Sequence, residues 1–336
     1  MKIIFQSYNT CCQNKAGGVQ IRIRKIAFLL KKQGIDVEFF SPFESDLSTC
    51  DVLHIFRLTV ENLSLIQSAK RQGKFVVMSA IVPIIRTNKL RFYKALRRLP
   101  IVTSYKIMYQ SLQQTDLIIV ETQAEAFFLN GIYSVPFSKM KVIPNGIDIN
   151  NYRGQEVFEN IGKDCDYILQ VGRFDENKNQ LNVIRALKNT GIDVVFIGGA
   201  DHSRQDYYDK CIKEAKGCDN IHFLGWQQKE SKVLRSAYSN AKLVIIPSHY
   251  ETFGLVALEG GIAGANLAFS KALPILCYSS FKDCLTFDPD NVKQMREVLL
   301  KAFEQPKNGA LKKRLIAEFN WETIIKQHID IYERNY

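Results

Sequence analysis

Short, uninterrupted apolar runs alternate with amphipathic stretches along most of this 336-residue chain, and this alternation constrains the fold more than any other feature. Runs such as VLHIF at 52–56 and LVIIP at 243–247 are apolar at nearly every position, as expected of strands that are covered on both faces. Residues 19–33 instead carry apolar side chains at helical spacing. Strands that alternate with helices predict an α/β fold built on parallel sheets.

The apolar runs form two series, which the polar stretch 150–166 separates. We expect strands at 2–5, 37–40, 52–56, 75–80, 117–120, 141–143, 167–171, 194–198, 221–225, 243–247 and 274–277. A chain of this length is typical of two domains. The prediction is a doubly wound domain over 1–155, a second over 164–318, and a terminal helix over 319–336 that packs back on the first domain.

Positive charge is concentrated in the first half of the chain. The net charge is +11, and the stretch between Glu61 and Asp116 has ten basic residues and no acidic one. Residues 86–109 interleave basic with aromatic and aliphatic side chains, which favours contact with an anionic membrane surface. The alternative is a solvated basic face over ordinary core positions. Pro100 predicts one helix before it and another after it.

The apolar segments are too short for a membrane span, and the N-terminal run is too short for a signal peptide. We therefore expect a cytoplasmic protein, peripheral on the inner face of the cell membrane. The eight cysteines show no CxxC pair and indicate ordinary thiols. A nucleic-acid partner is not expected, since no nucleic-acid-binding motif is present.

Two segments carry residues suited to an anionic, hydroxyl-rich ligand. Arg173 and Lys178 follow an expected strand end, and a guanidinium with an ammonium suits a diphosphate. Farther on, Thr252 is a plausible N-cap for a helix opened by Phe253, Gly254 and Leu255, whose amides would face an anion.

Two glutamates flank this helix start. Glu251 precedes it, and Glu259 lies eight residues later, roughly 12 Å along a helix axis. Carboxylates that hydrolyse a glycosidic bond lie at most about 9.5 Å apart, so this pair does not predict a hydrolase. Two glutamates at this distance can instead accept hydrogen bonds from hydroxyl groups at the two ends of a long ligand with an anionic middle. A nucleotide diphosphate sugar has this shape.

A metal site is not expected. Asp-x-Asp occurs at Asp164/Asp166, before a strand, and at Asp288/Asp290, in a DPD turn. The five histidines lack ligand spacing, although His249 lies near Glu251 and either contacts substrate or is structural.

Taken in order, several segments resemble the family 4 nucleotide-sugar glycosyltransferases of the GT-B fold. They are AGGVQ, QGIDVEFFSP, DLIIVETQAEAFFL, KVIPNGID, LQVGRFDENKN, FIGG, HFLGW and VIIPSHYETFGLVALEG. The resemblance implies two Rossmann-like domains facing each other across a cleft, and retaining transfer of a sugar without a metal or other cofactor. UDP-sugars are slightly favoured over GDP-sugars as donor. Two stretches depart from the family pattern: FVVMSAIVP at 75–83 lacks its usual histidine, and GGIAGANLAFSKALPILCYSS follows Glu259.

The resemblance also implies individual roles. Gly17 and Gly18 would let the backbone approach the donor, Arg173 and Lys178 would hold the diphosphate, and Glu251 would bind sugar hydroxyls. The backbone at Phe253, Gly254 and Leu255 would lie near sugar and phosphate, and Glu259 would bind the ribose. The acceptor would be lipid-linked or a polysaccharide, as in bacterial surface polysaccharide or glycolipid synthesis. A GT-B nucleotide-sugar 2-epimerase and a catalytically silent sugar-nucleotide-binding protein remain the alternatives.

Overall fold

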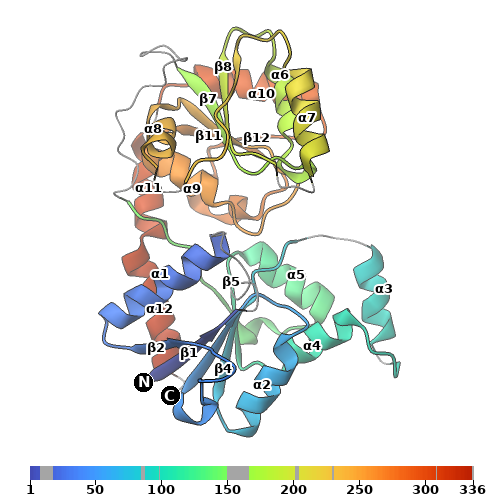
Figure 1. Ribbon diagram of the computed structural model, residues 1–336, viewed down its shortest axis with the longest axis vertical. Helices are drawn as coiled ribbons and strands as arrows, with labels where there is room; N and C mark the ends of the chain where they lie inside the picture. Colours follow the sequence, from blue (N-terminus) through green and yellow to red (C-terminus); the bar gives the residue numbers. More distant parts are fainter. Residues whose placement is uncertain are drawn as a thin grey trace. The chain divides into compact units, whose positions relative to one another are not determined.

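The computed structural model describes residues 1–7, 18–84, 88–97, 99–149, 166–200, 204–228, 231–307 and 309–334, apart from the side chains at 88, 89 and 91. The chain divides into two compact units (Figure 1). Unit 1 consists of Met1–Asn145 and Trp321–Tyr336, and unit 2 consists of Gly146–Asn320. Each unit has one parallel six-stranded sheet. The expected α/β fold with two doubly wound parallel sheets is confirmed.

The division between the units falls at Asn145/Gly146, earlier in the chain than the expected 155/164 boundary. Ile147 explains the difference, because its side chain is buried in the core of unit 2 and its N–H donates to the carbonyl of Phe319. The expected linker, 150–166, lies outside the described residues except at Asp166. The second division falls at Asn320/Trp321, and the helix that follows belongs to unit 1.

The sheet of unit 1 has the strand order β2-β1-β3-β4-β5-β6. Its strands are β1 (Lys2–Gln6), β2 (Asp36–Phe39), β3 (Val52–Phe56), β4 (Phe75–Ser79), β5 (Leu117–Val120) and β6 (Met140–Val142). Successive residues of a strand point to opposite faces of the sheet, and a hydrophobic core covers each face. Ile118 and Val120 pack on one face, for example, and Ile119 packs on the other. This two-sided burial is why the strands read as continuous apolar runs.

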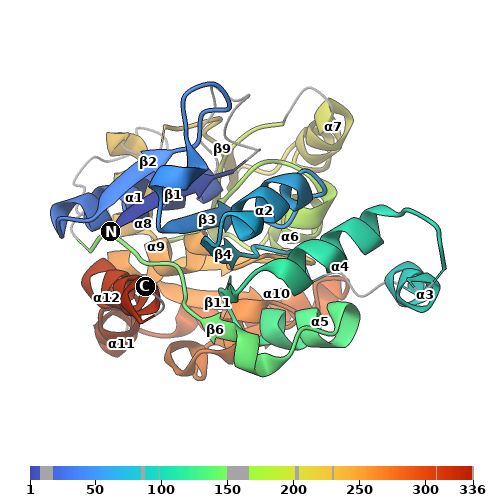
Figure 2. The ribbon, with the colours of Figure 1, turned by 90° about the horizontal axis from the view of Figure 1, so that it is seen from below.

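Helices cover both faces of this sheet. On one face lie α1 (Gly18–Lys32) and α12 (Trp321–Glu333), and on the other lie α2 (Asn62–Arg71), α4 (Ser104–Gln114) and α5 (Gln123–Tyr133). The helix α3 (Asn88–Leu96) packs on α4 and α5 and lies at the outer edge of the unit, away from the sheet (Figure 2). Pro100 lies between α3 and α4, so the predicted break is confirmed.

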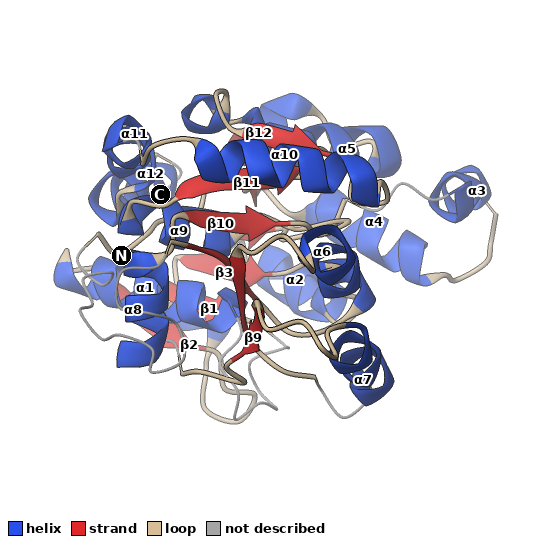
Figure 3. Cartoon of the chain, turned by 90° about the horizontal axis from the view of Figure 1, so that it is seen from above, coloured by secondary structure: helices blue, strands red, loops and turns tan. Residues whose placement is uncertain are grey.

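The sheet of unit 2 has the order β12-β11-β10-β7-β8-β9. Figure 3 labels β12, β11 and β10 on one side of this sheet and β9 at its other edge. Its strands are β7 (Tyr167–Val171), β8 (Asp193–Ile197), β9 (Ile221–Phe223), β10 (Leu243–Ile246), β11 (Asn266–Ser270) and β12 (Leu285–Phe287). The sheet grows from β7 toward β9 and then from β10 in the opposite direction. The switch point therefore lies between β7 and β10, and ligands of such sheets bind beyond the carboxyl ends of the strands there.

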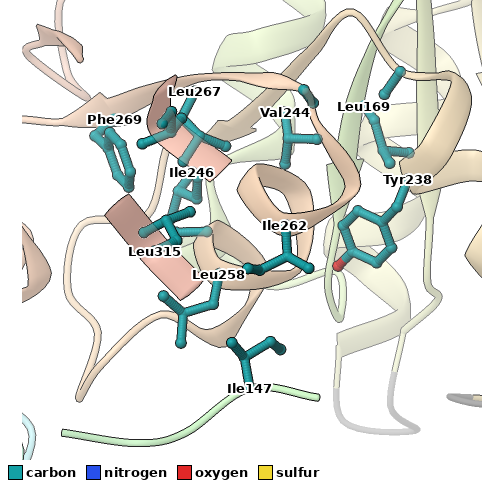
Figure 4. Close-up of a cluster of buried hydrophobic side chains, with 14 of the residues drawn as sticks. Ile147, Leu169, Tyr238, Val244, Ile246, Leu258, Ile262, Leu267, Phe269 and Leu315 are labelled. Atoms are coloured by element: carbon teal, nitrogen blue, oxygen red, sulfur yellow. The ribbon is translucent and has the colours of Figure 1, made fainter. Parts of the chain in front are cut away.

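Among the described residues, three helices cover each face of the second sheet. On one face lie α8 (Lys232–Asn240), α9 (Leu255–Ala263) and α11 (Gly309–Phe319), and on the other lie α6 (Gln180–Leu187), α7 (Gln205–Glu214) and α10 (Val292–Glu304). Helix α9 packs closely on the sheet and on α11 (Figure 4). A Cβ at Gly260 would lie 2.8 Å from Val244, and one at Gly261 would lie 2.3 Å from Leu315. Gly260 thus lets α9 lie against β10, and Gly261 lets it lie against α11.

One expected strand is wrong. Residues Pro274–Cys277 form a 3-10 helix that has Pro274 in its first turn, where a missing N–H costs nothing. The strands after α9 are β11 and β12, which the sequence analysis did not find. No helix in the described part of the chain is both long and apolar enough to cross a membrane.

Candidate functional site

The candidate site is formed by the two loops that leave the switch point of unit 2, one after β7 and one after β10. The first holds Arg173 and Lys178, and the second holds Glu251. Asn177 joins the loops with three hydrogen bonds. Its side-chain amide donates to the Tyr250 carbonyl at 3.0 Å, its side-chain oxygen accepts from the Tyr250 N–H at 3.0 Å, and its carbonyl accepts from the His249 N–H at 2.9 Å.

The loop after β7 is held close to the end of β8. Gly172 donates its N–H to the Ile197 carbonyl at 2.9 Å. Gly198 has φ +138°, and a Cβ there would lie 2.0 Å from the Gly172 carbonyl oxygen, so only glycine fits. The loop ends with Asp175, whose carboxylate accepts from the Lys178 N–H at 2.9 Å and caps a 3-10 turn over Glu176–Lys178.

The two basic residues of this loop have different environments. Lys178 Nζ lies 2.5 Å from Glu251 Oε1, and Ser248 Oγ donates to the same oxygen at 2.7 Å. The other oxygen, Glu251 Oε2, accepts no hydrogen bond from a described residue. Arg173 is 51% exposed, and its Nε lies 3.0 Å from Asp175 Oδ2. The sequence placed Lys178 and Glu251 in separate roles, whereas the structure makes them one ion pair.

A polar cavity of about 760 Å³ opens beside these loops. Its lining comes from three segments of unit 2 and consists of Arg173, Asp175, Glu176, Asn177, Arg204, His249 and Tyr250. We call it the Arg173 cavity. Arg173 and His249 line it together with Arg204 and Tyr250, to which sequence reasoning assigned no role. No motif marks Arg204, which lies on the connection after β8, whereas Tyr250 lies in the segment VIIPSHYETFGLVALEG beside Glu251.

The N-terminus of α9 differs from the prediction. The N-cap is Gly254, with φ +107°, and Thr252 caps nothing. A left-handed residue at this position favours glycine. The Phe253 ring is buried against Tyr278 and Phe319, so its side chain belongs to the core. The backbone N–H groups of Phe253, Gly254 and Leu255 donate to no described residue, which leaves them available to an anion.

Glu259 lies one turn into α9 and is 8% exposed. Tyr238 of α8 donates its hydroxyl to Glu259 Oε2 at 2.7 Å. Tyr238 itself is fully buried, so it holds the carboxylate in one orientation. Sequence reasoning missed this residue, since helical periodicity marks it only as a core position.

In unit 1, Gly18 is the first residue of α1, and Gly17 lies outside the described residues. Glu125 of α5 accepts from the N–H groups of Glu121 at 2.7 Å and Val82 at 2.9 Å, and so fixes the segment after β4 where the family histidine is missing. Arg22 pairs with Glu121 in the same interior. Burial raises the pKa of Glu125 to about 8, with the nearby Glu121 adding to the shift.

The described aspartates of the two Asp-x-Asp segments have other contacts. Asp288 accepts from Lys271 at 2.6 Å and from the Asp290 N–H at 3.0 Å, and His249 Nδ1 lies 3.7 Å from Asp290. Asp166 pairs with Lys242, while Asp164 lies outside the described ranges. Across those ranges, no three acidic, histidine or cysteine side chains form a cluster that could hold a metal ion.

Residues 154–318 match the family described as glycosyl transferases group 1. An uncharacterized glycosyltransferase of Methanocaldococcus jannaschii is 27% identical over 257 residues, which are 67% of this chain and 62% of that protein. A D-inositol 3-phosphate glycosyltransferase of Actinosynnema mirum is 31% identical over 173 residues, 46% of this chain and 41% of that protein. This chain therefore covers less than two thirds of the length of either relative.

The crystal structure of Anabaena HepE in complex with UDP has a TM-score of 0.75 and 18% sequence identity, over 99% of this chain and all of HepE. That similarity extends through both units. Over nearly its whole length this chain has the GT-B fold, and residues 154–318 are similar to the group 1 glycosyl transferases.

Proposed function

We propose that this protein is a retaining glycosyltransferase that moves a sugar from a nucleotide diphosphate sugar to a lipid-linked or polysaccharide acceptor. The observation that carries the proposal is the position of Arg173, Lys178 and Glu251 on the two loops at the switch point, where Lys178 pairs with Glu251. These loops belong to the stretch 154–318 that matches group 1 glycosyl transferases. Crystal structures of HepE with UDP and with UDP-glucose support a UDP-sugar as donor.

In this proposal the diphosphate lies between Arg173 and Lys178. The Arg173 guanidinium is half exposed and lines the Arg173 cavity, so it can reach a ligand with its planar fork of donors. The Lys178 ammonium has three N–H donors, and its bond to Glu251 uses one of them. The two cations stabilise the negative charge that develops on the departing diphosphate.

The transferred sugar lies against Glu251 and the start of α9. Glu251 Oε2 accepts from a sugar hydroxyl, while its Oε1 stays with Lys178 and Ser248. The amides of Phe253, Gly254 and Leu255 donate to sugar or phosphate oxygens, and the helix dipole adds positive potential there. Deeper in α9, Glu259 accepts from the ribose hydroxyls with Tyr238 holding it in place.

This arrangement favours attack by the acceptor on the same face of the sugar that the diphosphate leaves. Lys178 offsets the charge of Glu251 at 2.5 Å, which makes that carboxylate a poor nucleophile for a covalent intermediate. The acceptor oxygen bonds to the anomeric carbon as the bond to the diphosphate oxygen breaks. The acceptor proton passes to the departing phosphate oxygen.

The donor side of the proposal is tested by calorimetric titration with UDP and GDP and by slow hydrolysis of a panel of UDP- and GDP-sugars. Glu251→Gln should slow donor hydrolysis at least about tenfold while free UDP binds within about threefold of wild type, since Glu251 contacts the sugar. Asp166→Asn is the matched control, because it breaks a lysine pair at the other end of β7. No binding of either nucleotide by the wild type would refute the proposal, and loss of hydrolysis in EDTA would refute its metal-free mechanism.

We also propose that the protein docks on the inner, anionic face of the cell membrane through residues 86–109. Phe92 and Leu99 are exposed there, and so are the adjoining Ile101 and Val102. Other apolar residues of the segment belong to the core, as Tyr105 is buried in the core cluster of this face and Met108 packs against that cluster. The acceptor would then reach unit 1 from the lipid surface.

Two basic residues of this segment also have structural contacts. Lys94 donates to the Gly131 carbonyl at 2.6 Å, and Arg97 donates to Ser134 Oγ at 3.0 Å, both at the C-terminal end of α5. Cations at this end of a helix are stabilising. Replacing these two residues would therefore disturb folding as well as docking, so the apolar residues give a cleaner test.

The docking is tested by co-sedimentation with phosphatidylglycerol liposomes at low and high salt. Ile101→Ser with Val102→Ser should lower the bound fraction, and high salt should release the wild type, since each basic residue near the lipid contributes about 1 kcal/mol. Ile212→Ser, at an exposed position of α7, is the control. Equal sedimentation of wild type and double variant would refute docking through this segment.

A further inference from the structure

A second arginine faces the Arg173 cavity from a different part of unit 2. Arg204 lies directly before α7, on the connection that follows β8, whereas Arg173 follows β7. Its Nη1 lies 2.9 Å from Glu176 Oε2, just as Arg173 Nε lies 3.0 Å from Asp175 Oδ2. Two guanidinium groups therefore line the cavity, and each forms an ion pair with a carboxylate of the loop after β7.

The two pairs differ in how firmly the carboxylate is held. Asp175 is only 10% exposed and also accepts from the Lys178 N–H, so it cannot turn away. Glu176 is 55% exposed and Arg204 is 49% exposed. Exposed ion pairs of this kind stabilise a protein little, because water solvates both partners when they separate. The Arg204 guanidinium is therefore free to exchange Glu176 for another anion.

An anionic ligand in the cavity would favour that exchange. A phosphate group presents oxygens that a guanidinium can bind bidentately, whereas this structure shows a single contact between Arg204 and Glu176. The carboxylate of Glu176 lines the same cavity and would repel a diphosphate placed there. Arg204 and Glu176 should hence act on ligand affinity in opposite directions.

We propose that Arg204 is a third cationic ligand of the diphosphate, and that Glu176 competes with the diphosphate for it. This inference rests on the proposed function, which places the diphosphate beside Arg173. The competing carboxylate weakens binding of the nucleoside diphosphate that remains after transfer. It thereby assists release of that product, while the sugar-bearing donor gains additional contacts at Glu251 and α9.

The inference is tested by calorimetric titration of the full chain with UDP, UMP and uridine, with GDP and GMP as a second series. Arg204→Gln should weaken UDP binding about tenfold, which is the smallest loss expected when a hydrogen bond to a charged group is removed. Uridine binding should be unchanged, because uridine has no phosphate. Glu176→Gln should tighten UDP binding about two- to fivefold, the range for an exposed ion pair. Arg185→Gln is the control, because Arg185 of α6 is about as exposed as Arg204 and also pairs with a glutamate, Glu214, at 3.3 Å.

The opposite signs separate a ligand contact from a structural effect, since a variant that merely disturbs the fold would weaken binding in both cases. If the wild type binds UDP but Glu176→Gln binds it equally or more weakly, the competition is refuted. An unchanged UDP affinity in Arg204→Gln refutes the contact. If the wild type binds no nucleoside diphosphate, the proposed function fails, and this inference fails with it.

Discussion

His328 gives the sharpest test of the interior of unit 1. The side chain is fully buried on α12, and neither ring nitrogen has a hydrogen-bond partner among the described residues. Burial, together with a smaller effect of the positive charge of Arg22, lowers the pKa of His328 to about 3. A histidine whose pKa is lower in the folded than in the unfolded chain stabilises the fold above pH 6.5, and this stability is lost as the pH falls.

The size of the effect follows from the unfolded chain alone, because His328 stays neutral in the folded protein above about pH 4. Between pH 7.5 and 5.5 an unfolded histidine of pKa about 6.5 takes up most of one proton, which lowers the free energy of unfolding by about 1.4 kcal/mol. The pKa of His54 is also lowered well below the usual value by burial, so His54 adds a similar loss. His328→Leu should remove about half of the combined loss.

The assay is urea unfolding followed by tryptophan fluorescence at pH 7.5 and 5.5. The chain has two tryptophans, and Trp226→Phe leaves only Trp321, which packs in the same core cluster of unit 1. In this background His328→Leu is compared with His222→Gln, which changes a partly exposed histidine of β9 in unit 2. If the free energy of unfolding changes by the same amount between the two pH values in His328→Leu as in its parent, the reasoning about His328 is wrong.

Three further predictions concern unit 2. Glu259→Ala should weaken binding of free UDP, measured by calorimetry, by about 1.5–3 kcal/mol, and Tyr238→Phe should weaken it less. An unchanged UDP affinity in Glu259→Ala would exclude the ribose contact. Arg173→Lys should lose most donor turnover while it keeps the charge, because lysine lacks the planar fork; near-wild-type turnover would contradict the diphosphate contact. Gly198→Ala should lower the free energy of unfolding by at least about 2 kcal/mol, since its Cβ meets the Gly172 carbonyl. The control Gly191→Ala, with φ +71° and no atom within 4 Å, should lower it by only about 1 kcal/mol.

Much of the architecture follows from local patterns in the sequence. The first ten expected strands overlap β1 to β10, because two-sided burial requires apolar side chains at consecutive positions. The sequence likewise predicted the break between α3 and α4 at Pro100, since proline disrupts the interior of a helix. The strand β11 was missed because NLAFS begins with Asn266 and ends with Ser270, both polar. Its strand conformation depends on pairing with β10 and β12.

The sequence also placed four site residues after the carboxyl ends of strands, namely Arg173, Lys178, Glu251 and Glu259. This was possible because the position of each strand in the sequence also fixes which residues follow it. The pairing of Lys178 with Glu251, 73 residues apart, was not readable. It depends on β7 and β10 being neighbours, and neighbours in a parallel sheet need not be successive in the chain. Asn177, Tyr238 and Arg204 were missed for the same reason, since their partners come from other elements.

The start of α9 shows the limit of local reasoning most clearly. The sequence offered Thr252 as an N-cap, whereas the helix starts at Leu255 after a left-handed Gly254. The position of α9 is set by Gly260 and Gly261, which let it approach Val244 and Leu315. The sequence thus determined which residues are apolar, basic or acidic and which strand each one follows. Only the tertiary structure decided which of them meet, because contacts between loops are determined by strand order and by the close packing of helices on the sheet.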